Sequence, residues 1–125
     1  MGILQSATPA IVICTRDRPR AAAFYGETLG LKAVGEDGLA AVFETGGVTL
    51  RVSTVADFTP HGHTILGFRV ADVAATVRAL TAAGVAFRRI PGLAQDDLDV
   101  LTAPGGVHVA WFEDPDGNVL SVTDV

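Results

Sequence analysis

Alternation of apolar and polar residues predicts a strand, a helix and three further strands in the first part of the chain. Residues 8–15 are a β-branched run and predict a strand. Asp17 can cap the helix that follows, and Pro19 suits its first turn, where a missing N–H costs nothing. Gly30 can end this helix, which we expect to run to about Leu29. Three short β-rich runs, separated by glycines, follow at about 31–35, 39–44 and 47–53.

The same order of elements then repeats after a connector at residues 54–62. Residues 63–70 predict a strand, and Asp72 caps a helix that Gly84 ends, as Gly30 ends the first. Further strands are expected at about 85–90 and, after a polar loop at 91–97, through residue 123. The pattern is strand–helix–strand–strand–strand, twice.

This repeat predicts an α+β fold. Each half has one helix, which can cover only one face of its sheet. The other face must then be buried against the second half or remain as a concave wall, so the sequence predicts a cleft for a small ligand. Asp114-Pro115-Asp116-Gly117-Asn118 lies between two β-rich runs and predicts the tight turn of a hairpin.

Composition restricts the kind of partner. The chain has 125 residues, of which 49% are hydrophobic and 18% charged, which is typical of one globular domain. The net charge of −5 and the absence of a basic cluster argue against a nucleic-acid partner. No apolar run is long enough to span a membrane, and no basic segment of a signal peptide is present. The single cysteine, Cys14, fits a reducing compartment, so we expect a cytoplasmic protein.

Two groups of residues resemble a known superfamily. Phe24-Tyr25-Gly26-Glu27-Thr28-Leu29-Gly30-Leu31, together with Asp114-Pro115-Asp116-Gly117-Asn118, is similar to the vicinal oxygen chelate (VOC) superfamily, which includes glyoxalase I, extradiol dioxygenases and bleomycin-binding proteins. The resemblance covers residues from about 8 to 125 and implies a single domain of two βαβββ modules, at about 8–53 and 63–125. Such modules form curved mixed sheets around a cleft, with the helices on the outer face. Gln95-Asp96-Asp97-Leu98 and Thr102-Ala103-Pro104-Gly105-Gly106 resemble small bacterial glyoxalase/bleomycin-resistance-like proteins.

The resemblance also implies where a metal would be bound. Metal-using members hold His, Gln or Glu at matching positions of the two modules. In this chain these positions fall on Ala10, Ile65 and Ser121, and the fourth falls on Thr49 or Arg51. A divalent cation needs donors such as imidazole or carboxylate. We therefore expect no metal at these positions and no other cofactor.

Five residues are candidates for binding a small molecule. Arg51 and Thr49 alternate with Val48, Leu50 and Val52, so both should face away from the helix, and arginine suits a carboxylate or phosphate. Ser121 should face the cleft as a polar wall residue, and Trp111 offers an aromatic surface. His63 alternates with Ile65 and can serve as a hydrogen-bonding group or a base. The alternatives are a surface arginine, a solvated His63 beside His61 and a core tryptophan, and the face of Trp111 and His108 stays open.

These observations lead to three functional hypotheses, of which the third is a structural or assembly module in which a second chain completes the sheet. The first is a metal-independent protein of the glyoxalase/bleomycin-resistance type that binds a small, partly aromatic or acidic molecule in the cleft between the modules. The second is a lyase or isomerase of the VOC superfamily that uses a divalent metal at non-standard positions, or His63 as a general base. Members of the superfamily often pair, so we expect a homodimer with no membrane partner.

Overall fold

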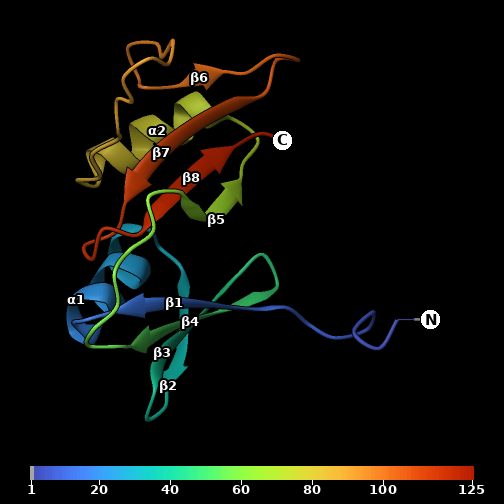
Figure 1. The fold of residues 1–125 in the computed structure, drawn as a ribbon, viewed down its shortest axis with the longest axis vertical. Coiled ribbons are helices and arrows are strands. Elements are labelled where there is room, and N and C mark those ends of the chain that lie inside the picture. Colours follow the sequence, from blue (N-terminus) through green and yellow to red (C-terminus); the bar gives the residue numbers. More distant parts are fainter. Residues whose placement is uncertain (1) are drawn as a thin grey trace. The chain divides into compact units, whose positions relative to one another are not determined.

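The computed structural model describes residues 2–125 and divides the chain into two units, which meet in sequence between Phe58 and Thr59 (Figure 1). This division falls inside the expected connector at 54–62. The first unit contains β1 (Ala10–Thr15), helix α1 (Arg18–Ala23), a π-helical turn η1 (Phe24–Thr28), β2 (Lys32–Glu36), β3 (Ala40–Thr45) and β4 (Val48–Thr54). Its strands form one sheet in the order β1-β4-β3-β2, in which β1 and β4 are parallel and the other pairs are antiparallel.

Local sequence explains where the first helix begins and ends. The Asp17 side chain accepts a hydrogen bond from the backbone N–H of Arg20 at 3.1 Å, and Pro19 lies in the first turn. Gly30 has a φ of 76°, a left-handed conformation that favours glycine, and it lies just after η1. The helix side of this sheet is a core in which Tyr25 contacts Phe43, with ring centroids 6.2 Å apart.

The second unit repeats this design. It contains β5 (Thr64–Arg69), helix α2 (Val73–Ala82), β6 (Leu101–Thr102), β7 (His108–Glu113) and β8 (Val119–Thr123). The sheet order is β5-β8-β7-β6, with β5 and β8 parallel (Figure 1). Asp72 caps α2 through a 2.9 Å bond from the N–H of Ala75. The α+β prediction of two similar modules is confirmed.

The expected strand at 85–90 is wrong. In this segment only Phe87 pairs, through an isolated bridge to Phe112, and the edge strand β6 forms further along at Leu101–Thr102. Phe87 nevertheless contributes its ring to the core, with its centroid 5.3 Å from that of Phe112. The apolar run therefore supplies core packing without completing a ladder of backbone hydrogen bonds.

The turn between β7 and β8 has the expected chemistry. Asp114 is 5% exposed and accepts hydrogen bonds from the backbone N–H groups of Asp116 and Asn118, both at 2.9 Å. The side-chain amide of Asn118 adds a third bond to Asp114 at 2.8 Å, and Gly117 has a φ of 89°. This buried carboxylate therefore organises the loop that joins the two central strands of the second sheet.

Among residues 2–125, no helix has the length and apolar character required to cross a lipid bilayer.

Candidate functional site

Each sheet packs one face against its own helix, and the opposite face, which we call the open face, carries the candidate residues. On the open face of the first sheet, Arg51 of β4 lies between Val12 of β1 and Val42 of β3. Thr49 lies in the next row along the strands, between Ala10 and Glu44. The predicted orientation of Arg51 and Thr49 away from the helix therefore matches the burial of Leu50 and Val52 on the helix side.

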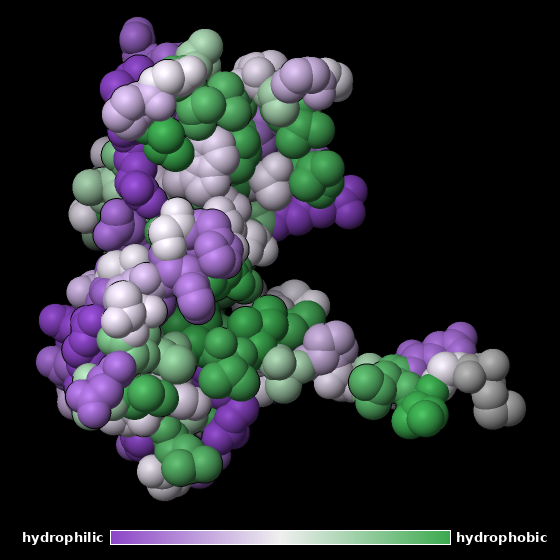
Figure 2. Space-filling model, viewed as in Figure 1, coloured by the Kyte–Doolittle hydropathy of each residue, from purple (hydrophilic) through white to green (hydrophobic). Residues whose placement is uncertain are grey.

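Apolar surface borders Arg51. Val12 is 60% exposed and Leu39, which precedes β3, is 71% exposed. The space-filling view shows apolar surface over the strands of the first unit (Figure 2). A ligand that contacts Arg51 would thus meet both a cation and hydrocarbon.

The structure decides the face of Trp111. Trp111 of β7 pairs with Ser121 of β8, and Ser121 pairs with Gly67 of β5, so the three residues form one row on the open face. Their neighbours Phe112 and Leu120 are 0% exposed and lie on the helix side. The alternative of Trp111 as a residue of the helix-side core is therefore excluded, and Trp111 and Ser121 lie side by side.

The register of the two sheets shows which residue corresponds to Ser121 in the first unit. Val12 precedes the helix cap Asp17 by as many residues as Gly67 precedes Asp72. Val12 pairs with Arg51, and Gly67 pairs with Ser121. Arg51, not Thr49, is thus the counterpart of Ser121.

With this correspondence, we can ask whether the residues at the four implied ligand positions could bind a divalent cation. The four implied ligand positions hold Ala10, Ile65, Arg51 and Ser121, which together offer a guanidinium and one neutral hydroxyl. A guanidinium is a permanent cation and repels a metal ion, so these residues do not fit a divalent cation. Within residues 2–125, no group of three or more His, Cys, Asp or Glu side chains is arranged to hold one elsewhere.

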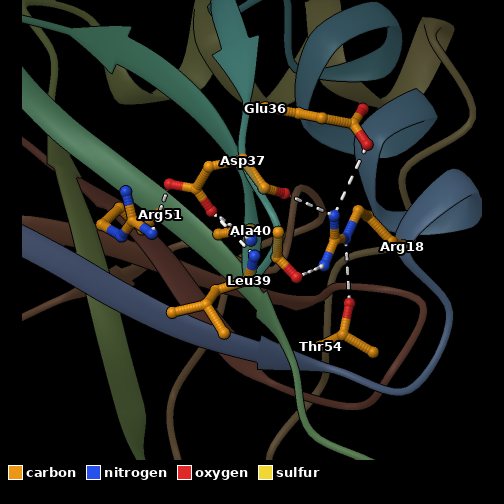
Figure 3. Close-up of polar contacts among 8 residues, drawn as sticks. Arg18, Glu36, Asp37, Leu39, Ala40, Arg51 and Thr54 are labelled. Carbon is orange, nitrogen blue, oxygen red and sulfur yellow. Dashed lines mark hydrogen bonds and ion pairs between the residues drawn. The ribbon is translucent and has the colours of Figure 1, made fainter.

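Arg51 is held in place by a residue that the sequence reading missed. Its Nη2 atom donates a 2.8 Å bond to Oδ2 of Asp37, in the turn between β2 and β3 (Figure 3). The other oxygen of Asp37 accepts the backbone N–H groups of Leu39 at 2.8 Å and Ala40 at 2.9 Å. These amide bonds, with the Arg51 side chain, lower the pKa of Asp37 from 3.8 to about 2. The Asp37-Gly38 dipeptide is a turn signal, but nothing in the sequence pairs it with Arg51.

Arg18 fastens the same turn to the start of α1. Its guanidinium donates to the carbonyl oxygens of Asp37 at 2.9 Å and Gly38 at 3.4 Å, and to the hydroxyl of Thr54 at 2.9 Å (Figure 3). Glu36 adds an ion pair at 3.5 Å. The turn that presents Asp37 to Arg51 is therefore tied to the helix and to β4.

The ionised form of Asp37 should make part of the folding stability dependent on pH. Because its folded pKa lies below the ordinary value of 3.8, this contribution is complete above about pH 4 and declines as the pH falls towards 2. Asp37→Asn keeps an oxygen for the two amides but loses the charge. We expect the difference in unfolding free energy between the wild type and Asp37→Asn to be largest near neutral pH and to shrink between pH 4 and 2. Urea unfolding at several pH values measures this difference, and a difference that stays constant over that range would contradict the assignment.

His63 is not on the sheet. β5 begins at Thr64, and its register shifts between Thr64 and Leu66, so the alternation from Ile65 back to His63 fails. His63 is exposed and stacks near His61, with ring centroids 5.1 Å apart. The structure thus separates His63 from the row of Trp111 and Ser121, and places it beside a second imidazole.

His108 lies in a different environment from Trp111. Its Nδ1 atom is 2.6 Å from Oδ2 of Asp124, and its backbone N–H donates to Oδ1 at 2.7 Å. The bond from the His108 ring is the main reason that the pKa of Asp124 is below its ordinary value. Both residues line a hollow of about 340 Å³ near the start of α2, together with Asp72, Asp96 and Thr102. None of the five candidate binding residues lines this hollow.

The loop before β6 is fastened by its own side chains. The Gln95 amide donates to the carbonyls of Arg88 and Asp99, both at 2.8 Å, and accepts from the N–H of Ile90 at 2.6 Å. Asp96 accepts from the N–H groups of Leu98 and Val100. Asp96 therefore organises the loop through backbone bonds.

Comparison with known proteins agrees with this architecture. The sequence model of the Glyoxalase/Bleomycin resistance protein/Dioxygenase superfamily matches residues 8–122, which is most of the chain. A search of curated proteins finds no match.

Several solved structures share the fold. A member of the glyoxalase/bleomycin resistance protein/dioxygenase superfamily from Sphaerobacter thermophilus DSM 20745 is 21% identical, with a TM-score of 0.76 over 97% of this chain and 98% of that one. Lactoylglutathione lyase from Agrobacterium tumefaciens is 20% identical, with a TM-score of 0.71 over 94% and 92%. A bleomycin resistance determinant encoded on the transposon Tn5 is 22% identical, with a TM-score of 0.72 over 94% and 97%. At these identities the structures show a common fold. With its two repeated modules and the match over residues 8–122, the chain belongs to the glyoxalase/bleomycin resistance protein/dioxygenase superfamily, also called the VOC superfamily.

Proposed function

We propose that this chain is a metal-independent protein that binds a small molecule through the open faces of its sheets. The observation that carries the proposal is the pair of matching positions, where Arg51 and Ser121 stand in place of metal donors. The proposed recognition residues are Arg51 and Thr49 on the first sheet and Trp111 and Ser121 on the second, with His63 just before β5.

Arg51 is the proposed contact for an acidic group on the ligand. Asp37 engages Nη2, while Nε and Nη1 make no hydrogen bond to any residue between 2 and 125. The Arg51 side chain is 29% exposed, so part of it remains open to a ligand. A guanidinium fixed at one nitrogen loses less side-chain entropy when it binds a carboxylate.

A thermal-shift screen tests this function. We expect EDTA, Ni²⁺, Zn²⁺ and Mn²⁺ to leave the unfolding temperature unchanged, and members of a small-molecule library to raise it, because a ligand that binds only the native state stabilises that state. Arg51→Ala should abolish the shift given by those ligands whose acidic group binds Arg51, whereas Arg78→Ala, at an exposed position on α2, should not. Elemental analysis of protein purified without chelator completes the experiment. Stoichiometric metal whose removal also abolishes an enzymatic activity would overturn the proposal.

A lyase or isomerase is the alternative, and the neighbouring rings of His61 and His63 are its one structural support. Either a metal bound by this pair or His63 as a general base would then be required. Binding of Ni²⁺ that is lost in His63→Ala, together with turnover, would favour this alternative.

We also propose a cytoplasmic homodimer. The exposed apolar side chains of the first unit, Val12, Val34 and Leu39 among them, support association, and Cys14 as the single cysteine fits a reducing compartment. Sedimentation equilibrium of the purified chain tests the dimer, and a monomer at all concentrations would refute it.

A further inference from the structure

Gly67 leaves a gap on the open face of the second sheet. It is exposed in the middle of β5, where a side chain would normally stand. If a Cβ atom is placed at Gly67, the Oγ atom of Ser121 lies 3.1 Å from it. Apart from Gly67 and the residues on either side of it in the chain, no other heavy atom lies within 4 Å. The missing side chain therefore opens a path from solvent to the Ser121 hydroxyl.

This hydroxyl has no partner in the described part of the chain. Ser121 is 6% exposed, and none of residues 2–125 forms a hydrogen bond with its side chain. Thr123, the next residue on the same face of β8, differs because its hydroxyl donates to the His108 carbonyl at 2.9 Å. Among the described residues, no fully buried side-chain oxygen lacks a hydrogen-bond partner, so the unbonded Ser121 hydroxyl is reached by solvent and can bond to a ligand.

Trp111 stands on the other side of Ser121 and does not fill the gap. It is directly opposite Ser121 in the ladder, but no atom of its indole lies within 4 Å of the Cβ position of Gly67. The space over Gly67 is thus bounded by a polar hydroxyl, and an aromatic side chain lies two strands away, because β8 stands between β5 and β7. A flat ring fits this combination because it can cover bare backbone and contact the indole.

Charge favours an anionic group on the ligand. Arg69 is the next residue on the same face of β5, is exposed, and forms no ion pair within residues 2–125. The nearest acidic residue on the Trp111 strand, Glu113, is already paired with Arg88 at 3.3 Å. The uncompensated charge beside Gly67 is therefore positive.

We propose that Gly67, Ser121, Trp111 and Arg69 form a binding site for an aromatic carboxylate, in which Gly67 determines specificity for a planar ring. We call this the Gly67 site. It rests on the proposed small-molecule-binding function and names the class of ligand. The ring covers Gly67 and faces Trp111, while an oxygen of the ligand bonds to the Ser121 hydroxyl within reach of the Arg69 charge.

The sole tryptophan makes this site directly observable. Titration with 4-nitrobenzoate, a planar carboxylate that quenches indole emission, should give saturable quenching of Trp111 in the wild type. Gly67→Ala should weaken binding about tenfold or more, because the new methyl group occupies the gap and turns the hydroxyl away, and Ser121→Ala should weaken it about tenfold through the lost hydrogen bond. Non-saturable quenching equal to that of free N-acetyltryptophanamide would overturn the proposal.

Matched controls separate binding from folding. Gly38→Ala adds the same methyl group where no atom lies within 4 Å and should bind like the wild type. Urea unfolding should show that Gly67→Ala remains folded, because the Ser121 hydroxyl can rotate. Cyclohexanecarboxylate, which is not planar, should compete at least tenfold more weakly than benzoate. Equal binding by Gly67→Ala and the wild type, or equal competition by the two carboxylates, would refute the Gly67 site.

The outcomes also distinguish this site from the broader function. If library ligands raise the unfolding temperature in an Arg51-dependent manner while 4-nitrobenzoate does not bind, the proposed function stands and the Gly67 site is wrong. If no ligand of any class raises the unfolding temperature, both the proposed function and the Gly67 site are wrong.

Discussion

Phe112→Ala is expected to lower the free energy of unfolding by about 3–5 kcal/mol, the usual cost of removing a buried aromatic ring. Phe112 is 0% exposed, lies opposite Leu120 in the ladder and contacts the ring of Phe87 at 5.3 Å between centroids. The cavity left by the alanine would be bordered on one side by the sheet, which is rigid, so the neighbouring side chains could move only slightly to fill it. Urea unfolding monitored by circular dichroism measures the loss.

Trp111→Ala is the matched control for this prediction, since it removes the neighbouring aromatic residue from the same strand. Trp111 lies on the open face, so its loss should cost less than about 1.5 kcal/mol while abolishing the binding of an aromatic ligand. Equal destabilisation by the two substitutions would mean that the assignment of the two faces is wrong.

Asp114→Ala should produce the second large effect, a loss of about 3 kcal/mol in the free energy of unfolding. The substitution leaves three donors near 2.9 Å without their acceptor, namely the N–H groups of Asp116 and Asn118 and the Asn118 amide. Each hydrogen bond lost by a buried donor costs free energy, and here all three lost bonds lie in the turn that joins β7 and β8.

Asp97→Ala provides the control for Asp114. Asp97 is exposed and has no hydrogen bond or ion pair with any other of residues 2–125, so its replacement should change the unfolding free energy by less than about 0.5 kcal/mol. If Asp114→Ala lowers the free energy of unfolding by less than about 1 kcal/mol, the three hydrogen bonds to Asp114 do not stabilise the turn, and the pairing of β7 with β8 maintains the hairpin without them.

Much of the fold was predictable because its signals are local. Asp17 and Asp72 cap the helices as expected, since capping depends on residues within one turn. The strand predicted at 85–90 failed for the opposite reason, because β-branched and aromatic residues also serve as plain core packing. The proposed site was predictable in part. Alternation of side chains correctly placed Arg51 on the open face. His63 precedes the first residue of β5, so alternation along the strand does not apply to it.

The sequence by itself determined the repeat, the helix ends, the β7–β8 turn and the absence of metal donors at Ala10 and Ile65, because each depends on neighbouring residues or on side-chain chemistry. Only the tertiary structure decided that Trp111 shares the open face with Ser121, that Asp37 holds Arg51, and that Gly67 leaves open space beside the Ser121 hydroxyl. These contacts join residues far apart in the chain. Strand register sets them, and register comes from packing and hydrogen bonding across the whole sheet, which no local pattern encodes.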